Sequence, residues 1–253
     1  MARQVGTFKI DGTIGDLTFY RSGGDYLIRS KGGVDGDRIK NDPNFQRTRE
    51  NGSEFGEAAV QGKLIRQAFR TLVDKVADSR VTSRLTSLLV KVVQSDTTNE
   101  RGSRKVKDGN LALLKDFEFN KKLSFSSTVL ASITSSVDKS SGSSSASFTI
   151  IPKNDVVYPN GATHYKVSLA AGLVDFDGAI YEVDVAESEI SPIDSNSQEI
   201  TLSNEYTGGT ESPLFLLLAI EFYQAVNESM YPMNSRAMKV LGVDVSVPAI
   251  VET

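Results

Sequence analysis

The last part of the chain consists of short strand-like segments, and this pattern constrains the fold more than any other feature. From Phe117 onward, runs rich in Val, Ile, Phe, Tyr and Thr alternate with turn signals such as YPNG at residues 158–161. Branched and aromatic residues favour strands, whereas Gly, Pro, Asn and Asp favour the turns between them. Seven or eight such strands predict an antiparallel β-sandwich of immunoglobulin or fibronectin size, although the cysteine pair and tryptophan of antibody domains are missing.

The longest apolar stretch, residues 214–220 within PLFLLLAIEF, belongs to this region. A membrane-spanning helix needs about 20 apolar residues, so the stretch predicts a buried strand and no membrane span is expected. The N-terminus lacks a basic region followed by an apolar core, so Sec-type secretion is not expected. The compartment is left open.

Residues 42–95 show helical periodicity. Asp42 and Pro43 form a helix start, because Asp caps free N–H groups and Pro fits the first helical position. Apolar residues then recur at spacings of three and four up to Val76, and a second stripe follows a break near Asp78. Both stripes predict core-facing helices, with Arg80, Arg84 and Lys91 on the polar face of the second. Gly52, Gly56 and Gly62 interrupt the first pattern and predict a kink or a close approach of another segment.

A polar and basic stretch, residues 95–110, follows the helices and includes RGSRKVK at 101–107. It predicts a loop or solvated linker, with a short helix near residues 109–114. Contact with nucleic acid or with an acidic partner surface is the less favoured interpretation.

The first 33 residues contain seven glycines between short apolar runs. Gly23 and Gly24 predict a hairpin that pairs residues 17–21 with 26–30, because glycine adopts positive φ without steric cost. Gly12 and Gly15 predict a second turn or bulge. An isolated ribbon of this size is marginally stable in water, so it must lie against the rest of the chain or against another chain.

These patterns together predict an α+β fold with three parts. Residues 1–34 form an N-terminal β-ribbon, residues 35–110 a two-helix segment with the basic linker, and residues 111–253 the immunoglobulin- or fibronectin-like β-sandwich.

The sequence offers little support for catalysis. Cysteine is absent and His164 is the sole histidine; no GxSxG, P-loop or dinucleotide-binding motif occurs. Asp175 and Asp177, with Glu182 and Asp184 nearby, form the densest acidic cluster. Calcium binding there is an alternative to the simpler interpretation of DFDG as a hairpin turn. We therefore expect no enzyme activity, no cofactor and no assigned metal ligand.

Charge is unevenly distributed along the chain, whose net charge is −4. Residues 1–110 hold 20 Lys and Arg against 14 Asp and Glu, and residues 111–253 hold 8 against 18. One explanation of this uneven charge is that the two regions have independent surfaces. The alternative is that basic and acidic faces meet between copies of the chain. Interleaved acids in the basic half disfavour nucleic acid as a partner.

The opening GTIGDLTFYRSGGDYLIRSKGGV, followed by NDPNFQRTRENGSEFGEAA, resembles that of a group of uncharacterised proteins from Bacteroidota. The matching positions are Gly12, Gly15, Phe19, Tyr20, Arg29, Pro43, Gln46, Arg49 and Phe55. The resemblance covers about the first 95 residues and implies a ribbon, a helix and β-sandwich regions behind them. It implies no activity and no catalytic residue.

We accordingly expect a non-enzymatic structural protein that self-assembles or forms part of a filament, shell, phage virion or injection device. Second copies of the chain, or other protein components of the assembly, are the expected partners. The expected contact residues lie in the ribbon and are Phe8, Ile10, Ile14, Leu17, Phe19, Tyr20, Tyr26, Ile28 and Arg29.

The alternative function is a binding or adhesion module that recognises carbohydrate or a protein through loops at the ends of the sandwich. Tyr158, Tyr165, Tyr206 and Tyr231 are its candidate aromatic contacts.

Overall fold

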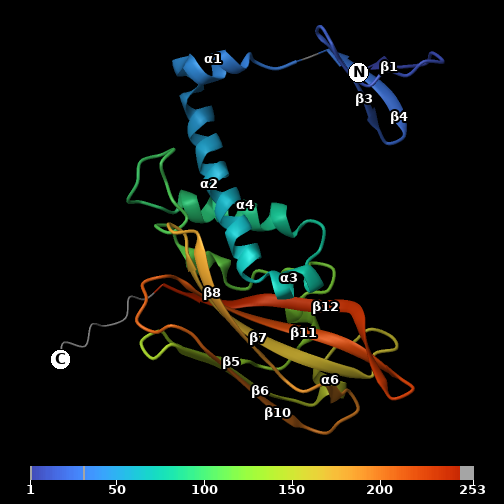
Figure 1. Ribbon diagram of the computed structural model, residues 1–253, viewed down its shortest axis with the longest axis vertical. Helices are drawn as coiled ribbons and strands as arrows, with labels where there is room; N and C mark the ends of the chain where they lie inside the picture. The colour runs from blue at the N-terminus through green and yellow to red at the C-terminus, as the bar shows by residue number, and fades with distance from the viewer. Residues whose placement is uncertain (1, 31, 246–253) are drawn as a thin grey trace. The chain divides into compact units, whose positions relative to one another are not determined.

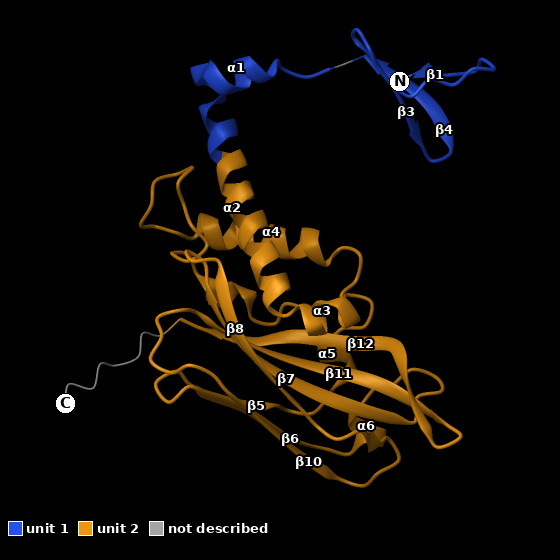
Figure 2. Cartoon of the chain, in the orientation of Figure 1, with its two compact units in different colours: residues 1–50 blue, residues 51–253 orange. Residues whose placement is uncertain are grey.

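A computed structural model describes residues 2–30 and 32–245 of the chain. The chain divides into two compact units, residues 1–50 and 51–253, coloured separately in Figure 2. The predicted α+β class with a β-sandwich-like C-terminal region is confirmed.

The first unit contains a small antiparallel sheet, which we call the ribbon (residues 2–30). Its strands are β1 (Ala2–Arg3), β2 (Gly12–Ile14), β3 (Leu17–Ser22) and β4 (Asp25–Ser30), in the order β1-β4-β3-β2. The predicted hairpin is confirmed, since Leu17 pairs with Ser30 and Ser22 pairs with Asp25. Gly23 and Gly24 form the turn with φ of 61° and 92°, values that few other residues adopt.

The start of the helical segment differs from the prediction. A helix α1 (Gly36–Asn41) precedes Asp42, and Pro43 begins a 3-10 helix, η1 (Pro43–Phe45), so that the α-helix α2 (Gln46–Ala68) starts three residues later than expected. The reason is local: Asp42 accepts a hydrogen bond from Asn44 N at 2.9 Å, which caps the tighter turn.

The second unit contains three layers (Figure 1). Its helices and short turns are the rest of α2, α3 (Arg70–Val76), α4 (Val81–Gln94), η2 (Leu111–Leu114), α5 (Phe125–Thr128) and α6 (Pro152–Asp155). Its strands are β5 (Thr134–Asp138), β6 (Ser143–Ile150), β7 (His164–Asp175), β8 (Ile180–Glu187), β9 (Ser191–Pro192), β10 (Gln198–Glu205), β11 (Leu214–Val226) and β12 (Ser229–Asp244). The large sheet has the order β12-β11-β7-β8, with β9 also paired to β7, and the small sheet has the order β10-β6-β5.

The position of β11 between two cores explains why its sequence is apolar at consecutive positions. Leu214, Leu216 and Leu218 point into the core shared with the small sheet, whereas Phe215 and Leu217 point into the core shared with the helices. Side chains alternate between the faces of a strand, so a strand covered on both faces needs apolar residues throughout. The predicted buried strand is confirmed, and the helices form the second cover of its sheet.

The helical layer packs closely on the large sheet and on itself. Phe69, at the junction of α2 and α3, lies against Gly172 of β7 and meets Phe215 edge-to-face at 6.4 Å between ring centroids. Gly62 of α2 faces Leu89 of α4, so this glycine permits the predicted close approach. Gly52 and Gly56 have open space around them.

Among the strands that the sequence predicts from Phe117 onward, two fall in FEFNKKLSFSSTVLASITSSVD, residues 117–138, and the structure corrects this. Only Thr134–Asp138 is a full strand, while Phe125–Thr128 is a helical turn capped by the Ser124 hydroxyl. Residues 116–119 pair briefly with the edge of β12, through Asp116 N to Val240 O at 2.9 Å and Phe119 N to Met238 O at 2.9 Å. Serine and threonine hydroxyls that cap a turn compete with strand pairing here.

The basic loop 95–110 is anchored to its surroundings by buried carboxylates. Asp96 accepts hydrogen bonds from Thr98 N at 2.8 Å and Lys105 N at 3.0 Å, and Glu54 of α2 accepts one from Gly102 N at 2.9 Å. Burial favours the neutral form of Asp96, but the hydrogen bonds that its carboxylate accepts from Asn99, Lys105 and Thr98 hold its pKa well below its usual value. The loop backbone is therefore held in place, while most of its basic side chains stay exposed.

We predict that Gly172→Ala destabilises the protein. An added Cβ would lie 2.8 Å from Phe69 Cε1 and 3.1 Å from Val183 Cγ2, so the helix layer must shift. Overpacking of this kind costs about 1–3 kcal/mol, which urea denaturation measures. Gly242→Ala in β12, where nothing lies within 4 Å, is the matched control and should change stability little. Equal effects of the two substitutions would contradict the close contact.

We further predict that Asp96→Asn weakens the acid dependence of stability. The pKa of Asp96 is lower in the folded than in the unfolded protein, so its stabilisation is complete above about pH 5 and is lost as the pH falls towards the folded value. The variant should be less stable than the parent at pH 7, where a hydrogen-bonded charge is replaced, and should lose less stability on acidification. Denaturant unfolding between pH 7 and pH 3 tests this against Asp74→Asn, an exposed control on α3. An unchanged pH slope in Asp96→Asn would refute the assignment.

Candidate functional site

The ribbon places the predicted contact residues on two different faces. Phe19 lies opposite Ile28 and Arg21 lies opposite Tyr26 across the β3–β4 pair, and Ile14 lies opposite Leu17 across the β2–β3 pair. Opposite residues share a face, and the face alternates along each strand. One face, which we call the apolar face, therefore carries Ile14, Leu17, Phe19, Tyr26 and Ile28, with Arg21 beside Tyr26.

Tyr20 and Arg29 lie on the opposite face of the ribbon with Leu27. The Arg29 guanidinium lies over the Tyr20 ring, 5.3 Å from its centroid, so these two predicted contact residues contact each other. Phe8 and Ile10 lie in the loop between β1 and β2. Gln4 fastens this loop by accepting a hydrogen bond from Ile10 N at 2.9 Å, while Phe8 is 91% exposed.

None of the ribbon residues described is buried. Within the apolar face, Ile14 is 61% exposed and the others are exposed or half-buried. The ribbon thus has an amphipathic pattern and builds no core of its own.

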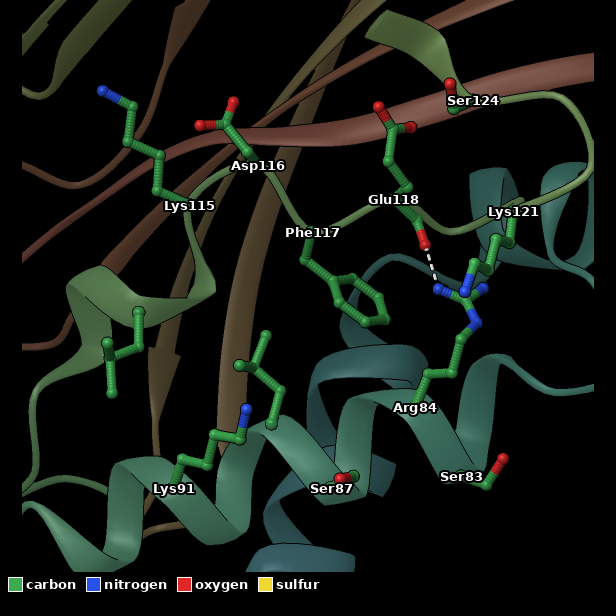
Figure 3. Close-up of a pocket in the computed structure, with 12 residues that line it drawn as sticks. Ser83, Arg84, Ser87, Lys91, Lys115, Asp116, Phe117, Glu118, Lys121 and Ser124 are labelled. Carbon is green, nitrogen blue, oxygen red and sulfur yellow. Dashed lines mark hydrogen bonds between the residues drawn. The ribbon is translucent and has the colours of Figure 1, made fainter.

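A second candidate site is a groove in the other unit, between α4 and residues 113–124 (Figure 3). Its larger part has a volume of about 810 Å³. A smaller part of about 650 Å³ adjoins it, since both are lined by Ser83, Arg84 and Lys121. We call it the basic groove because its lining cations are Arg80, Arg84, Lys91, Lys115, Lys121 and Lys122.

Arg84 fixes the two walls of the basic groove to each other. Its guanidinium donates to Glu118 O at 2.5 Å and to Phe119 O at 3.1 Å, the first of which Figure 3 shows, and forms an ion pair with Asp78 at 2.8 Å. It also lies over the Phe117 ring at 5.3 Å. Burial opposes ionisation of Asp78, but hydrogen bonds from backbone N–H groups and the charge of Arg84 lower its pKa.

The carboxylates of the basic groove already have partners. Asp78 binds Arg84, Asp116 lies 3.5 Å from Lys239 Nζ, and Glu118 accepts hydrogen bonds from two N–H groups of α5, that of Phe125 at 2.7 Å and that of Ser126 at 3.0 Å.

In contrast, the side chains of Arg80, Lys91, Lys115, Lys121 and Lys122 make no hydrogen bond or ion pair within residues 2–30 and 32–245. With six cations and three carboxylates in its lining, the groove therefore carries a net positive charge. Its α4 wall was visible in the sequence as Arg80, Arg84 and Lys91 on one helix face. The opposite wall was not, because its position depends on pairing with β12.

The four tyrosines proposed for the sandwich loops separate into two pairs. Tyr165 and Tyr206 are buried, and their hydroxyls donate to Gln198 Oε1 at 2.5 Å and to Ser143 O at 2.8 Å. Burial raises the pKa of both to about 12. Tyr158 and Tyr231 are 41% and 57% exposed and remain available for binding.

Tyr158 lines a cavity of about 420 Å³ together with His164, Lys153 and Asp194. His164 is the first residue of β7, and its Nδ1 lies 2.9 Å from the Thr163 hydroxyl. The side chains of Lys153 and Asp194 have no partner among the residues described, so the cavity combines an aromatic ring with free polar groups.

The acidic cluster around DFDG forms a hairpin turn between β7 and β8, as the simpler interpretation predicts. Asp175 accepts hydrogen bonds from Asp177 N at 2.9 Å and Gly178 N at 3.1 Å, and Asp177 pairs with Lys107 at 2.6 Å. Glu182 and Asp184 bind the backbone of the strand segment around residues 205–207. Across the described parts of the chain, no three acidic or histidine side chains gather as metal ligands.

Among the residues that the structure describes, no helix is both long enough and apolar enough to cross a membrane.

Comparisons with known proteins add one weak likeness. No protein-family model and no curated protein matches the chain. A solved structure described as "pH-induced modulation of Streptococcus parasanguinis adhesion by Fap1 fimbriae" is similar over 48% of this chain and 84% of that chain, with 14% sequence identity and a TM-score of 0.24. A likeness at this level carries no conclusion about function.

Proposed function

We propose that the protein is a non-enzymatic structural protein that assembles with copies of itself or with other components of a filament, shell, virion or injection device. The ribbon supplies the contact between subunits. The observation that carries this proposal is the apolar face, a set of five side chains on one side of a sheet in which no described residue is buried.

The size of the apolar face sets the strength of such a contact. Full burial of an apolar side chain contributes about 1.5–3 kcal/mol, so five contribute roughly 7–15 kcal/mol before any loss is counted. Association itself costs about 4–15 kcal/mol in lost freedom of motion. One ribbon therefore supports a weak contact, and stable assembly follows when several contacts act together.

The edges and the connection of the ribbon also suit contact with a neighbouring chain. Strands β1 and β2 are the two edges of the sheet, and edge strands leave backbone groups open to pairing. Gly32 and Gly33 lie between the ribbon and α1, and glycine imposes few steric limits on the path of a chain. The opposite net charges of residues 1–110 and 111–253 favour encounters between copies.

The similarity of the N-terminal residues to the Bacteroidota group suggests a lineage for this architecture. It supplies no mechanism, so the proposal depends on the ribbon alone.

We predict that full-length protein forms oligomers at high concentration and that Phe19→Glu weakens them at least tenfold, because it places a charge in the apolar face. Thr18→Glu, the neighbouring residue on the opposite face, should have little effect. Deletion of residues 1–34 should leave a monomer. Light scattering and native mass spectrometry over a concentration series measure the oligomeric state. A full-length protein that stays monomeric would contradict the proposed assembly. A truncated protein that assembles equally well would contradict the proposed role of the ribbon.

A second function has its own observation. The cavity at Tyr158 lies among the loops of the sandwich and offers an aromatic ring, a carboxylate and an ammonium group, the combination that binds sugar rings and hydroxyls. A binding or adhesion module that recognises carbohydrate is thus the alternative proposal.

For this alternative, we predict that the full chain binds glycans on an array and that Tyr158→Ala reduces binding at least tenfold, because the stacking surface is lost. Tyr181→Ala removes another exposed tyrosine, on β8, and should leave binding unchanged. Absence of any glycan signal, or equal loss in both variants, would remove carbohydrate recognition from consideration.

A further inference from the structure

We propose that the basic groove binds an acidic peptide segment of a partner protein in extended conformation. The groove belongs to the second unit and involves no residue of the ribbon. The proposal therefore goes beyond the assembly contact and does not rest on it.

The charge balance of the groove carries this inference. Six cations line the groove against the three carboxylates of Asp78, Asp116 and Glu118, and two of these carboxylates are paired with Arg84 and Lys239, so the lining keeps an excess of positive charge. Lys91, Lys115 and Lys121 reach the groove with no partner among the residues described. In a protein with net charge −4, three lysines gathered in one concavity attract an anion.

The walls of the groove suit an extended chain. Ser83, Ser87 and Lys91 follow one another at intervals of four residues, so they form a row along one face of α4. From Arg80 to Lys91 the helix rises about 16 Å, at 1.5 Å per residue. An extended peptide of about five residues covers this length at 3.3 Å per residue. The Ser83 hydroxyl already donates to Arg80 O at 2.9 Å, which leaves its oxygen to accept from a peptide N–H group.

The apolar part of the groove favours peptide over nucleic acid. Leu88 and Leu113 offer partly exposed aliphatic surface to side chains of a peptide. The aromatic ring in the lining, Phe117, is nearly buried and Arg84 already covers it, so it offers no free surface on which a base can stack. The sequence pI of about 5.2 is also far from that of a typical nucleic-acid-binding domain.

Fluorescence anisotropy with a fluorescein-labelled octaglutamate peptide and the full-length protein tests the proposal. We expect binding that weakens as salt rises, because exposed charges are screened. The triple variant Lys91→Glu, Lys115→Glu, Lys121→Glu should weaken binding at least tenfold. The control Lys40→Glu, Arg47→Glu, Lys63→Glu changes net charge equally at exposed sites outside the groove and should change binding less than twofold. The corresponding Lys→Gln triple variant repeats the test with a smaller perturbation, and circular dichroism verifies folding.

Three results would overturn the proposal. The first is absence of octaglutamate binding at low salt. The second is an equal loss of binding in the groove and control variants, which would indicate an effect of net charge alone. The third is tighter binding of a labelled oligothymidine that depends on the same three lysines, which would assign the groove to nucleic acid. None of these results depends on whether the ribbon mediates assembly, so the two proposals fail separately.

Discussion

The burial of β11 on both faces is the constraint on which the second unit depends. Its even-numbered residues from Leu214 to Phe222 need one apolar layer and the odd-numbered Phe215, Leu217 and Ala219 need another. The small sheet supplies the first layer and the helices supply the second. Phe69 inserts where Gly172 leaves space, so the helix layer fits the sheet in one position. The helices and the sandwich therefore share a core.

The position of the helix layer in turn creates the basic groove. Once α4 lies over the sheet, residues 116–119 pair with the edge of β12 beside it, and a concavity remains between them. Arg84 bridges this gap with hydrogen bonds to two backbone carbonyl groups of the opposite wall. The pairing of residues 116–119 with β12 also satisfies backbone groups at an otherwise open edge of the large sheet, which limits strand addition by other chains at this point. The groove therefore results from the packing of α4 and residues 116–119, and the charged side chains that line it lie outside the hydrophobic core.

Sequence patterns predicted the elements well and their arrangement less well. Local signals sufficed for the Gly23–Gly24 hairpin, the DFDG turn and the apolar stripes of the helices, because each depends on neighbouring residues. They failed at residues 117–133, where the Ser124 cap and the pairing with β12 decide the structure. The second wall of the groove and the cavity beside Tyr158 depend on contacts between distant segments, which periodicity does not encode.

The apolar face of the ribbon differs from the apolar faces of the large sheet. In the second unit each apolar face of β11 is matched by another layer, whereas the apolar face of the ribbon has no matching layer within the ribbon. Two features of the ribbon limit indiscriminate pairing of its edges and of this face. Its edge strands are three residues or shorter, and the Arg21 guanidinium lies over the Tyr26 ring on the apolar face. Under the proposed assembly, a complementary surface of another subunit would cover the apolar face, whereas short edges and a charged cover restrict its pairing with unrelated chains.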